Sequence, residues 1–215
     1  MKKLVLTLGV VAGMIGTSFG QGFITVAGTQ ASSTNGSTFL SAAYTGGAAG
    51  GTAWGAGLAA NTAYKMEILT AVSPTSTALF GNATLGGWLD TAILGGNNTF
   101  SGRLTAGAGV LANNAPAGQS QQWLAVSWSA NLGTWAQVSA ALIAGTFTTP
   151  GFVGWSLVGT GASGPASPGL PLALTGAGNP IPNGWSMLAV PVPEPATIAL
   201  AGLGGLALLA LRRKK

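Results

Sequence analysis

The chain of 215 residues contains no cysteine and no histidine. It therefore has no thiolate nucleophile and no imidazole base, and it can form neither a disulfide nor a zinc site built from these ligands. Acidic side chains are scarce as well, since Asp and Glu together number 3. No loop gathers the carboxylate and amide oxygens that calcium requires. We therefore expect no metal and no other cofactor.

Charge is also nearly absent from the middle of the chain. Lys and Arg number 8, but most of them lie in the first three and the last four residues. Between residues 21 and 190 the charged side chains sum to zero; they are Lys65, Glu67, Asp90 and Arg103. A protein that binds nucleic acid needs a clustered basic face. The formal net charge of +5 therefore does not indicate nucleic-acid binding.

Residues 1–20 have the pattern of a secretory signal peptide. Two lysines precede an apolar run at residues 4–15, and Ser18 and Gly20 supply the small side chains of a cleavage site. We expect the Sec translocon to export the chain and signal peptidase to cut between Gly20 and Gln21. The alternative is an uncleaved N-terminal anchor, for which the apolar run is short.

A second apolar segment, residues 196–211, follows Pro193, Glu194 and Pro195. As a helix it would span about 24 Å, less than the roughly 30 Å of a hydrocarbon core, so it predicts a weak tether in the inner membrane. The prolines keep the chain before it extended, which suits recognition by a protease. Four basic residues close the chain and favour the cytoplasmic side: Arg212, Arg213, Lys214 and Lys215.

This order of a Pro-Glu-Pro motif, a short hydrophobic helix and a basic end resembles the PEP-CTERM sorting signal of Gram-negative bacteria. The resemblance implies that exosortase, a membrane Cys protease/transpeptidase, recognises the tail. It also implies a destination in the cell envelope, at the cell surface or in the extracellular matrix. The alternative is a plain C-terminal anchor. No Leu-Pro-x-Thr-Gly motif precedes the helix, so the tail does not resemble that of Gram-positive sortase substrates.

The body between the two segments predicts an all-β fold. Its apolar runs are short and are separated by Gly, Asn, Ser and Pro, which is typical of an antiparallel β-sandwich, here jelly-roll-like. We divide the chain into a signal peptide (1–20), one β-sandwich ectodomain (21–190) and the sorting signal (191–215). The expected strands are 23–27, 64–70, 88–94, 123–129, 147–149, 152–158 and 185–190, with a proline-rich irregular connection over 165–182.

Two of these strands have an informative pattern. In strand 64–70, Met66 and Ile68 share one face with Tyr64, so Lys65 and Glu67 should face solvent. Segment 123–128 is apolar on both faces and predicts a central strand that is covered on each side.

One segment has helical rather than β periodicity. Thr134 and Gln137 form a capping box, Val138 and Leu142 follow at helical spacing, and Gly145 can end the helix. We expect a helix of about ten residues packed on the sandwich. The body also loosely resembles the β-rich ectodomains of other PEP-CTERM proteins, which implies a sandwich but no particular activity.

Candidate chemistry in the body is sparse. Glu67 and Asp90 could form a glycosidase-type pair of carboxylates, but Glu67 is expected on a solvent face, and we expect no enzyme. Trp54 lies among Gly and Ala in an expected loop and is our candidate for a glycan contact, whereas Trp123, Trp128 and Trp155 are expected in the core.

We therefore expect a secreted, non-catalytic surface or matrix protein associated with exopolysaccharide or biofilm. The alternative function is a lectin-like module that binds exopolysaccharide.

Overall fold

The computed structural model describes residues 21–26, 29–30, 33–35, 52–53, 58–73, 76–99, 102–164, 171–176, 178–181 and 184–190. The predicted signal peptide and the predicted tail helix lie outside these residues. Most of the described residues belong to two β-sheets and a single α-helix, α2 (Trp135–Ala144). In the part of the chain that is described, no helix is long and apolar enough to cross a membrane.

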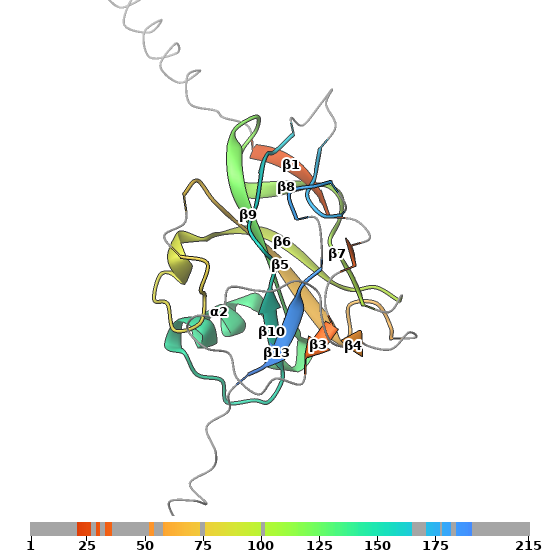
Figure 1. Cartoon of the computed structure of the whole chain (residues 1–215), viewed down its shortest axis with the longest axis vertical. Coiled ribbons are helices and arrows are strands. Elements are labelled where there is room, and N and C mark those ends of the chain that lie inside the picture. The colour runs from red at the N-terminus through yellow and green to blue at the C-terminus, as the bar shows by residue number, and fades with distance from the viewer. Residues whose placement is uncertain are drawn as a thin grey trace, which may run out of the picture.

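The smaller sheet has three strands in the order β12-β1-β8, and the larger sheet has ten. The order in the larger sheet is β2-β7-β6-β5-β9-β10-β13-β3-β4, with β11 also paired to β9. Figure 1 shows the smaller sheet near one end of the molecule and helix α2 near the other. The strands are β1 (Gln21–Val26), β2 (Thr29–Gln30), β3 (Ser33–Asn35), β4 (Thr52–Ala53), β5 (Tyr64–Ala71), β6 (Leu89–Asn97), β7 (Arg103–Thr105), β8 (Gly107–Pro116), β9 (Ser120–Ser129), β10 (Phe152–Trp155), β11 (Gly159–Ala162), β12 (Leu172–Ala173) and β13 (Ser186–Ala189).

A first hydrophobic core fills the space between the two sheets. The smaller sheet contributes Ile24 and Val26 from β1, and the larger sheet contributes Met66 and Ile68 from β5 together with Trp123 from β9. All five side chains are fully buried. The sandwich predicted from the short apolar runs is therefore confirmed. Most strand pairs are antiparallel, but β1–β12 and β13–β3 are parallel.

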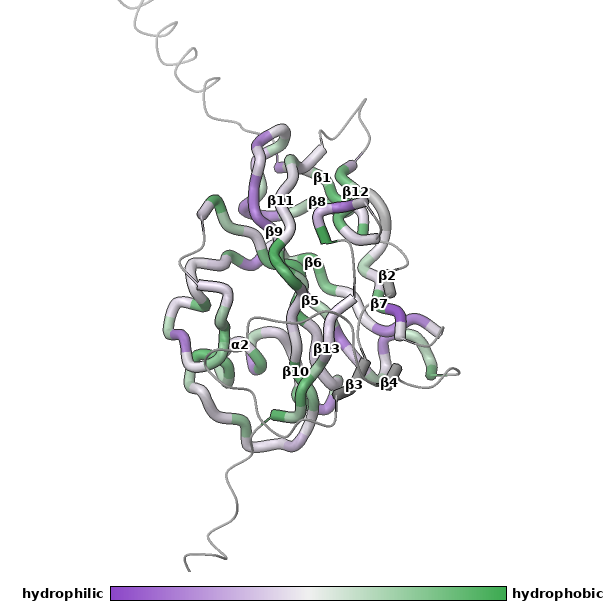
Figure 2. The backbone as a smooth tube through the Cα atoms, viewed as in Figure 1, coloured by the Kyte–Doolittle hydropathy of each residue, from purple (hydrophilic) through white to green (hydrophobic). Residues whose placement is uncertain are grey.

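A second hydrophobic core lies on the other face of the larger sheet, under α2. Leu124 and Val126 of β9 are packed there with Val138 and Leu142 of the helix. Because successive residues of a strand point to opposite faces, β9 contributes to both cores, as its apolar sequence predicts. Figure 2 shows hydrophobic stretches along β9 and β13 in the interior of the molecule.

Helix α2 begins and ends where the sequence predicts. The side-chain oxygen Oε1 of Gln137 accepts the N–H of Thr134 at 2.8 Å, and this capping box starts the helix. Gly145 ends it in the left-handed conformation, at φ 67°, which a glycine adopts without strain.

The expected strand at residues 147–149 is wrong. The N–H of Thr146 donates to the carbonyl of Ala141, so this segment completes the end of α2 instead of joining a sheet. Phe147 is buried as a single anchor, and its ring stacks on that of Phe80 with centroids 6.3 Å apart. The predicted strand 152–158 is also shorter, since β10 ends at Trp155.

Seven strands were not predicted, namely β2, β3, β4, β7, β8, β11 and β12, and β12 lies within the connection expected to be irregular. Of these strands, β8 and β11 lack apolar alternation. The Gly159–Ala162 strand reads Gly-Thr-Gly-Ala. A Cβ atom added at Gly159 would lie 2.4 Å from the backbone of Pro180, so a larger residue could not occupy this position without a shift. Close packing selects small residues here and thereby removes the pattern that marks a strand.

Candidate functional site

Several residues singled out from the sequence lie outside the described residues. They are Gly20 of the cleavage site, Trp54, and the sorting motif and basic tail at 193–195 and 212–215. Gln21, on the other side of the expected cleavage site, is exposed and pairs with Pro116 at the start of β1. The three tryptophans expected in the core, Trp123, Trp128 and Trp155, are fully buried as predicted.

The expectation that Glu67 faces solvent is wrong, because its side chain is buried. Only 1% of its surface is accessible. It lies in the middle of β5, between β6 and β9, where its cross-strand neighbours are Leu94 and Val126. The alternation of β5 does place Lys65 and Glu67 on one face, but this face belongs to the α2 side of the sheet. Helix α2, which is distant in sequence, packs over that face, so alternation did not reveal the burial.

The structure brings Glu67 and Asp90 together. Strand β6 has a register shift opposite Ile68 and Leu69, and Asp90 lies at this irregularity. The Asp90 carboxylate accepts the N–H of Ala92 at 2.6 Å, which holds the bulge in place. The same carboxylate is within hydrogen-bonding reach of the Glu67 side chain.

Burial and the neighbouring carboxylate raise the pKa of Glu67. Desolvation is the largest cause, followed by the hydrogen bond and the charge of Asp90, and together they raise the pKa of Glu67 to about 9. Glu67 is therefore protonated and neutral at pH 7. Its oxygen Oε1 has no hydrogen-bond partner among the described residues.

This pair of carboxyl groups does not match a glycosidase. In such enzymes the two groups are about 5–9.5 Å apart, because a glycosidic bond, or that bond and a water, must fit between them. Two groups in hydrogen-bonding reach leave no such room. The 1% exposure of Glu67 also excludes a substrate from its carboxyl group. The two carboxyl groups named from the sequence do lie close together, but that of Glu67 is buried between strands rather than open to solvent.

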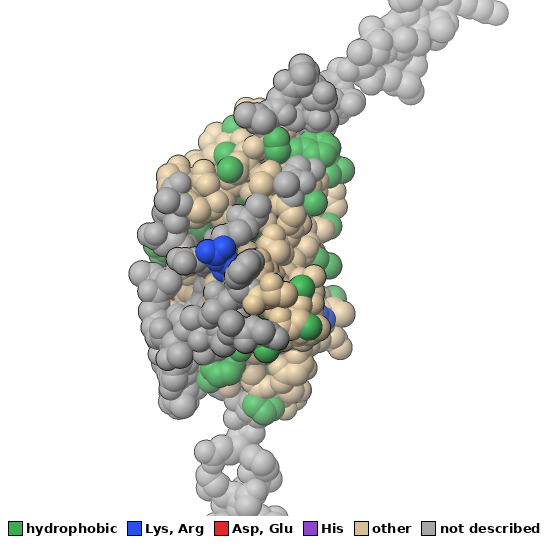
Figure 3. All heavy atoms as spheres, turned by 90° about the vertical axis from the view of Figure 1, so that its right-hand side faces the viewer, with side chains coloured by type: hydrophobic (Ala, Val, Ile, Leu, Met, Phe, Trp, Pro, Cys, Tyr) green, Lys and Arg blue, Asp and Glu red, His purple; other side chains and the backbone are tan. Residues whose placement is uncertain are grey.

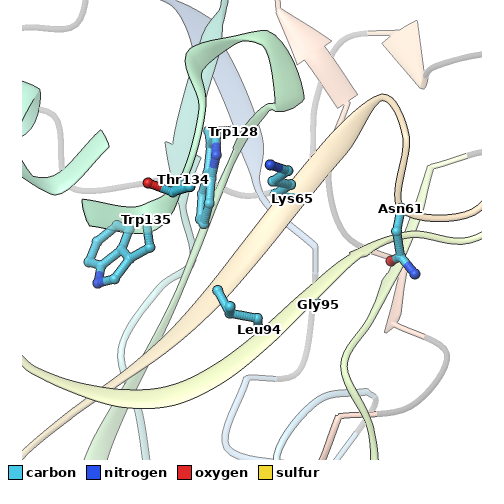
Figure 4. A pocket seen from close by; sticks show the side chains of 7 residues that line it. All are labelled: Asn61, Lys65, Leu94, Gly95, Trp128, Thr134 and Trp135. Atoms are coloured by element: carbon cyan, nitrogen blue, oxygen red, sulfur yellow. The ribbon is translucent and has the colours of Figure 1, made fainter. Parts of the chain in front are cut away.

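A pocket of about 350 Å³ opens nearby on the same face of the larger sheet. Its floor comes from β5, β6 and β9, one side comes from the first turn of α2, and the other from the loop before β5 (Figure 4). Its lining is mostly apolar, with three polar side chains. The lining residues are Asn61, Lys65, Leu94, Gly95, Trp128, Thr134 and Trp135.

Strand register positions the cation of this pocket. Lys65 and Trp128 are directly opposite each other on β5 and β9, so the lysine stem lies beside the indole. Lys65 Nζ donates to the carbonyl oxygen of Gly133 at 3.2 Å, and Trp128 Nε1 donates to the same oxygen at 3.0 Å. These two bonds tie the start of α2 to the sheet and hold the ammonium group at the pocket.

A pair of indole rings forms the wall next to this cation. The ring centroids of Trp128 and Trp135 are 5.6 Å apart, and the rings are tilted by 37°. Trp128 is completely buried, whereas Trp135 retains 9% exposure. The sequence pattern predicted the start of the helix at Thr134 but not the pocket that Trp135 lines. The capping box in the sequence does place Trp135 at the start of the helix. That Trp135 packs against Trp128 of β9 is known only from the folded structure.

Gly96 allows the loop before β5 to approach the pocket. A Cβ atom at Gly96 would lie 2.6 Å from the Asn61 side-chain oxygen and 2.7 Å from the Tyr64 carbonyl oxygen. Asn61 itself has a positive φ of 60°, a conformation that asparagine tolerates better than most residues. Together these two residues place an exposed amide group at the rim.

The described residues contain no group of three or more side chains of the types that ligate a metal ion. The surface is also poor in charge, as the sequence predicts. Figure 3 shows one face of the molecule, on which basic side chains cover only a small area among uncharged atoms.

The comparison with protein families decides how the tail is interpreted. Residues 191–214 match the family model of the PEP-CTERM protein-sorting motif. This chain carries a PEP-CTERM sorting signal. The tail recognised from its Pro-Glu-Pro motif, apolar segment and basic end is thus confirmed, and the chain is an exported protein that exosortase processes at the membrane for delivery to the cell surface. No curated protein and no solved structure matches the chain.

Proposed function

We propose that this PEP-CTERM protein is a non-catalytic component of the cell surface or extracellular matrix, associated with exopolysaccharide or biofilm. The observation that carries the proposal is the sorting motif at residues 191–214. A protein that is delivered to the surface and whose charges between residues 21 and 190 sum to zero is suited to remain embedded in a matrix, because low net charge favours association.

The tail would act as a temporary tether. The Sec translocon and signal peptidase deliver the body across the inner membrane, and the apolar segment 196–211 then holds the chain there. Arg212, Arg213, Lys214 and Lys215 stay on the cytoplasmic side and stop translocation. Pro193, Glu194 and Pro195 present an extended chain to exosortase, which releases or transfers the ectodomain.

Three features of the described residues support a non-catalytic role. Glu67 is neutral and inaccessible, so it offers no general base at neutral pH. The residues that line the pocket include no carboxylate. The chain also contains no His and no Cys that could act as nucleophile or base.

The experiment that tests this function compares the tagged full chain in cells with and without exosortase. We expect a lower apparent mass and surface or matrix location only where exosortase is present. Pro193→Ala combined with Pro195→Ala should block both changes, whereas Thr197→Ser, a conservative change just after the motif, should not. Equal mass and location in the two strains would contradict the proposal.

A second candidate function is a lectin-like module that binds exopolysaccharide. The pocket favours it, because small-molecule sites are concave and mostly apolar with a few polar groups, as here. Trp54, outside the described residues, remains the candidate contact from the sequence. Retention of the full chain on immobilised exopolysaccharide tests this function, and Trp54→Ala tests whether that residue takes part.

A further inference from the structure

The cation in the pocket has no counter-charge among the described residues. The acidic side chains of the described part are Glu67 and Asp90. Lys65 is not among the groups that shift the pKa of Glu67, and its ammonium group bonds to the uncharged carbonyl of Gly133. An ammonium group that is half-buried and unneutralised attracts an anion more strongly than one in open solvent.

The pocket also presents hydrogen-bond donors that the fold does not use. Lys65 has three N–H groups, and its hydrogen bond to the Gly133 carbonyl uses one of them, which leaves donors available. The indole N–H of Trp135, another lining residue, has no partner among the described residues, but Figure 4 shows it on the side of the ring away from Trp128 and Lys65. By contrast, other indole N–H groups donate to carbonyl or hydroxyl oxygens, namely those of Trp88, Trp123, Trp128 and Trp185. The remaining donors of the Lys65 ammonium group favour a ligand rich in acceptor oxygens.

The remaining surface of the pocket is apolar and small. Leu94 is 61% exposed and forms one part of it. In Figure 4 the Leu94 side chain lies on the same side of the sheet as Lys65 and the two indoles. A volume of about 350 Å³ is near the lower end of the range for small-molecule sites, so it suits one or two rings rather than a long chain. Asn61 adds an exposed amide that can bond to a hydroxyl group.

We propose that this pocket binds a carboxylate-bearing sugar unit, a uronic acid residue of an acidic polysaccharide, with its carboxylate on Lys65. The unused donors bond to the ring and hydroxyl oxygens, and the C–H face of the sugar lies on Leu94 and Trp135. The proposal rests on the second candidate function and goes beyond it, because it names the site and the class of sugar.

The test is a calorimetric titration of the full chain in a detergent whose head group contains no sugar. The probes are trigalacturonic acid and the neutral galactose trimer of the same linkage. We expect the acidic trimer to bind at least about tenfold more tightly, since a hydrogen bond to a charged group contributes more than one between neutral groups.

Three variants locate the binding. Lys65→Met should weaken binding of the acidic trimer about tenfold or more, while Lys65→Arg should retain most of it. Arg103→Met is the matched control, since it removes the same charge from β7, which does not line the pocket. Leu94→Trp should abolish binding by filling the pocket, and it is tolerated by the fold because Leu94 is 61% exposed. Circular dichroism confirms that each variant is folded.

Four other outcomes would contradict the proposal, and each would show which part of it is wrong. Equal affinities of Lys65→Met and Arg103→Met for the acidic trimer would place binding elsewhere on the chain, and the lectin-like function would stand without this site. Equal binding of both trimers would exclude selectivity for the carboxylate. Tighter binding of benzoate than of galacturonate would assign the pocket to aromatic acids. Absence of binding of both trimers by the folded chain would overturn this site, and retention of the chain on immobilised exopolysaccharide would then show that the lectin-like function stands without it.

Discussion

The two faces of strand β5 differ in whether the polar groups on them have hydrogen-bond or charge partners. On the face toward the smaller sheet, Met66 and Ile68 lie in an apolar core, and the polar groups near them are paired: the N–H of Trp185, for example, donates to Ser127 Oγ at 2.7 Å. On the face toward α2, Lys65 has no counter-charge among the described residues and Glu67 has an unpaired oxygen.

This difference indicates that the inter-sheet core stabilises the fold, whereas the α2 face carries the candidate binding site. Buried polar groups are usually hydrogen-bonded, because an unpaired one costs about 1–3 kcal/mol. The inter-sheet core follows this rule and holds the sandwich together. The α2 face departs from it at the buried oxygen of Glu67, and two residues away on the same strand the Lys65 ammonium group lines a pocket that a ligand can enter.

The largest effect is expected in the inter-sheet core. Trp123→Ala should lower the free energy of unfolding by about 3–5 kcal/mol, because it removes a completely buried indole and leaves a cavity. Urea unfolding of the full chain, followed by circular dichroism, measures the change. Trp123→Phe is the control and should cost less. A loss no larger than that of an exposed residue would mean that the two sheets do not depend on this core.

A pH-dependent effect is expected on the opposite face. The folded-state pKa of Glu67 is about 9, above the usual carboxyl value of 4.5, so the native state holds a proton that the unfolded state releases. The free energy of unfolding should therefore fall as pH rises from 4.5 to about 9, because the proton that stabilises the native state is lost as its pKa is approached.

The variant Glu67→Gln removes this proton and should flatten the pH dependence, which urea unfolding at several pH values measures. Asp90→Asn is the matched variant on the neighbouring strand. If the slope is the same in the wild type and in Glu67→Gln, Glu67 is not the group that titrates.

A smaller effect is expected where α2 begins beside the pocket. Gln137→Ala removes the acceptor of the Thr134 N–H and should cost about 1 kcal/mol of stability, as the loss of a helix cap does. Ser139→Ala, in the same helix, should leave stability nearly unchanged, since its hydroxyl bonds only to the Ala136 carbonyl within the turn. Thermal unfolding of the two variants gives the comparison, and equal midpoints would argue against the capping box.

The smallest effect is expected at the rim of the pocket. Leu94→Thr should change the free energy of unfolding by less than about 0.5 kcal/mol, because the side chain is 61% exposed. Glu67 lies directly opposite Leu94 on β5. Variants of the two residues therefore compare a buried and an exposed position on the α2 face of the sheet. A loss of several kcal/mol, measured by urea unfolding, would show that Leu94 is part of the core.

Much of the fold could be predicted where local pattern and tertiary packing agree. Alternation in 64–70 and the two-sided apolar run at 123–128 correspond to β5 and β9. The capping box and Gly145 correspond to the ends of α2. The pattern failed where packing selects small residues, as in β11, and where one aromatic residue, Phe147, is an anchor and not part of a strand.

The candidate site could be predicted only in part. The sequence pointed to Glu67 and Asp90 as the pair of carboxylates, but not to their burial, which depends on the bulge in β6 and on the packing of α2 over β5. The pocket escaped prediction because its cation and its indole come from segments about 70 residues apart, which meet only in the folded sheet.

The sequence by itself determined where the protein is sent, because a sorting signal is read from a short linear segment whose residues act in order along the chain. It also determined the class of fold, because strand periodicity is local. The tertiary structure alone decided that Glu67 is buried and neutral, and that Lys65, Trp128 and Trp135 line one pocket. These properties depend on which distant segments pack together, and desolvation and proximity arise only from that packing.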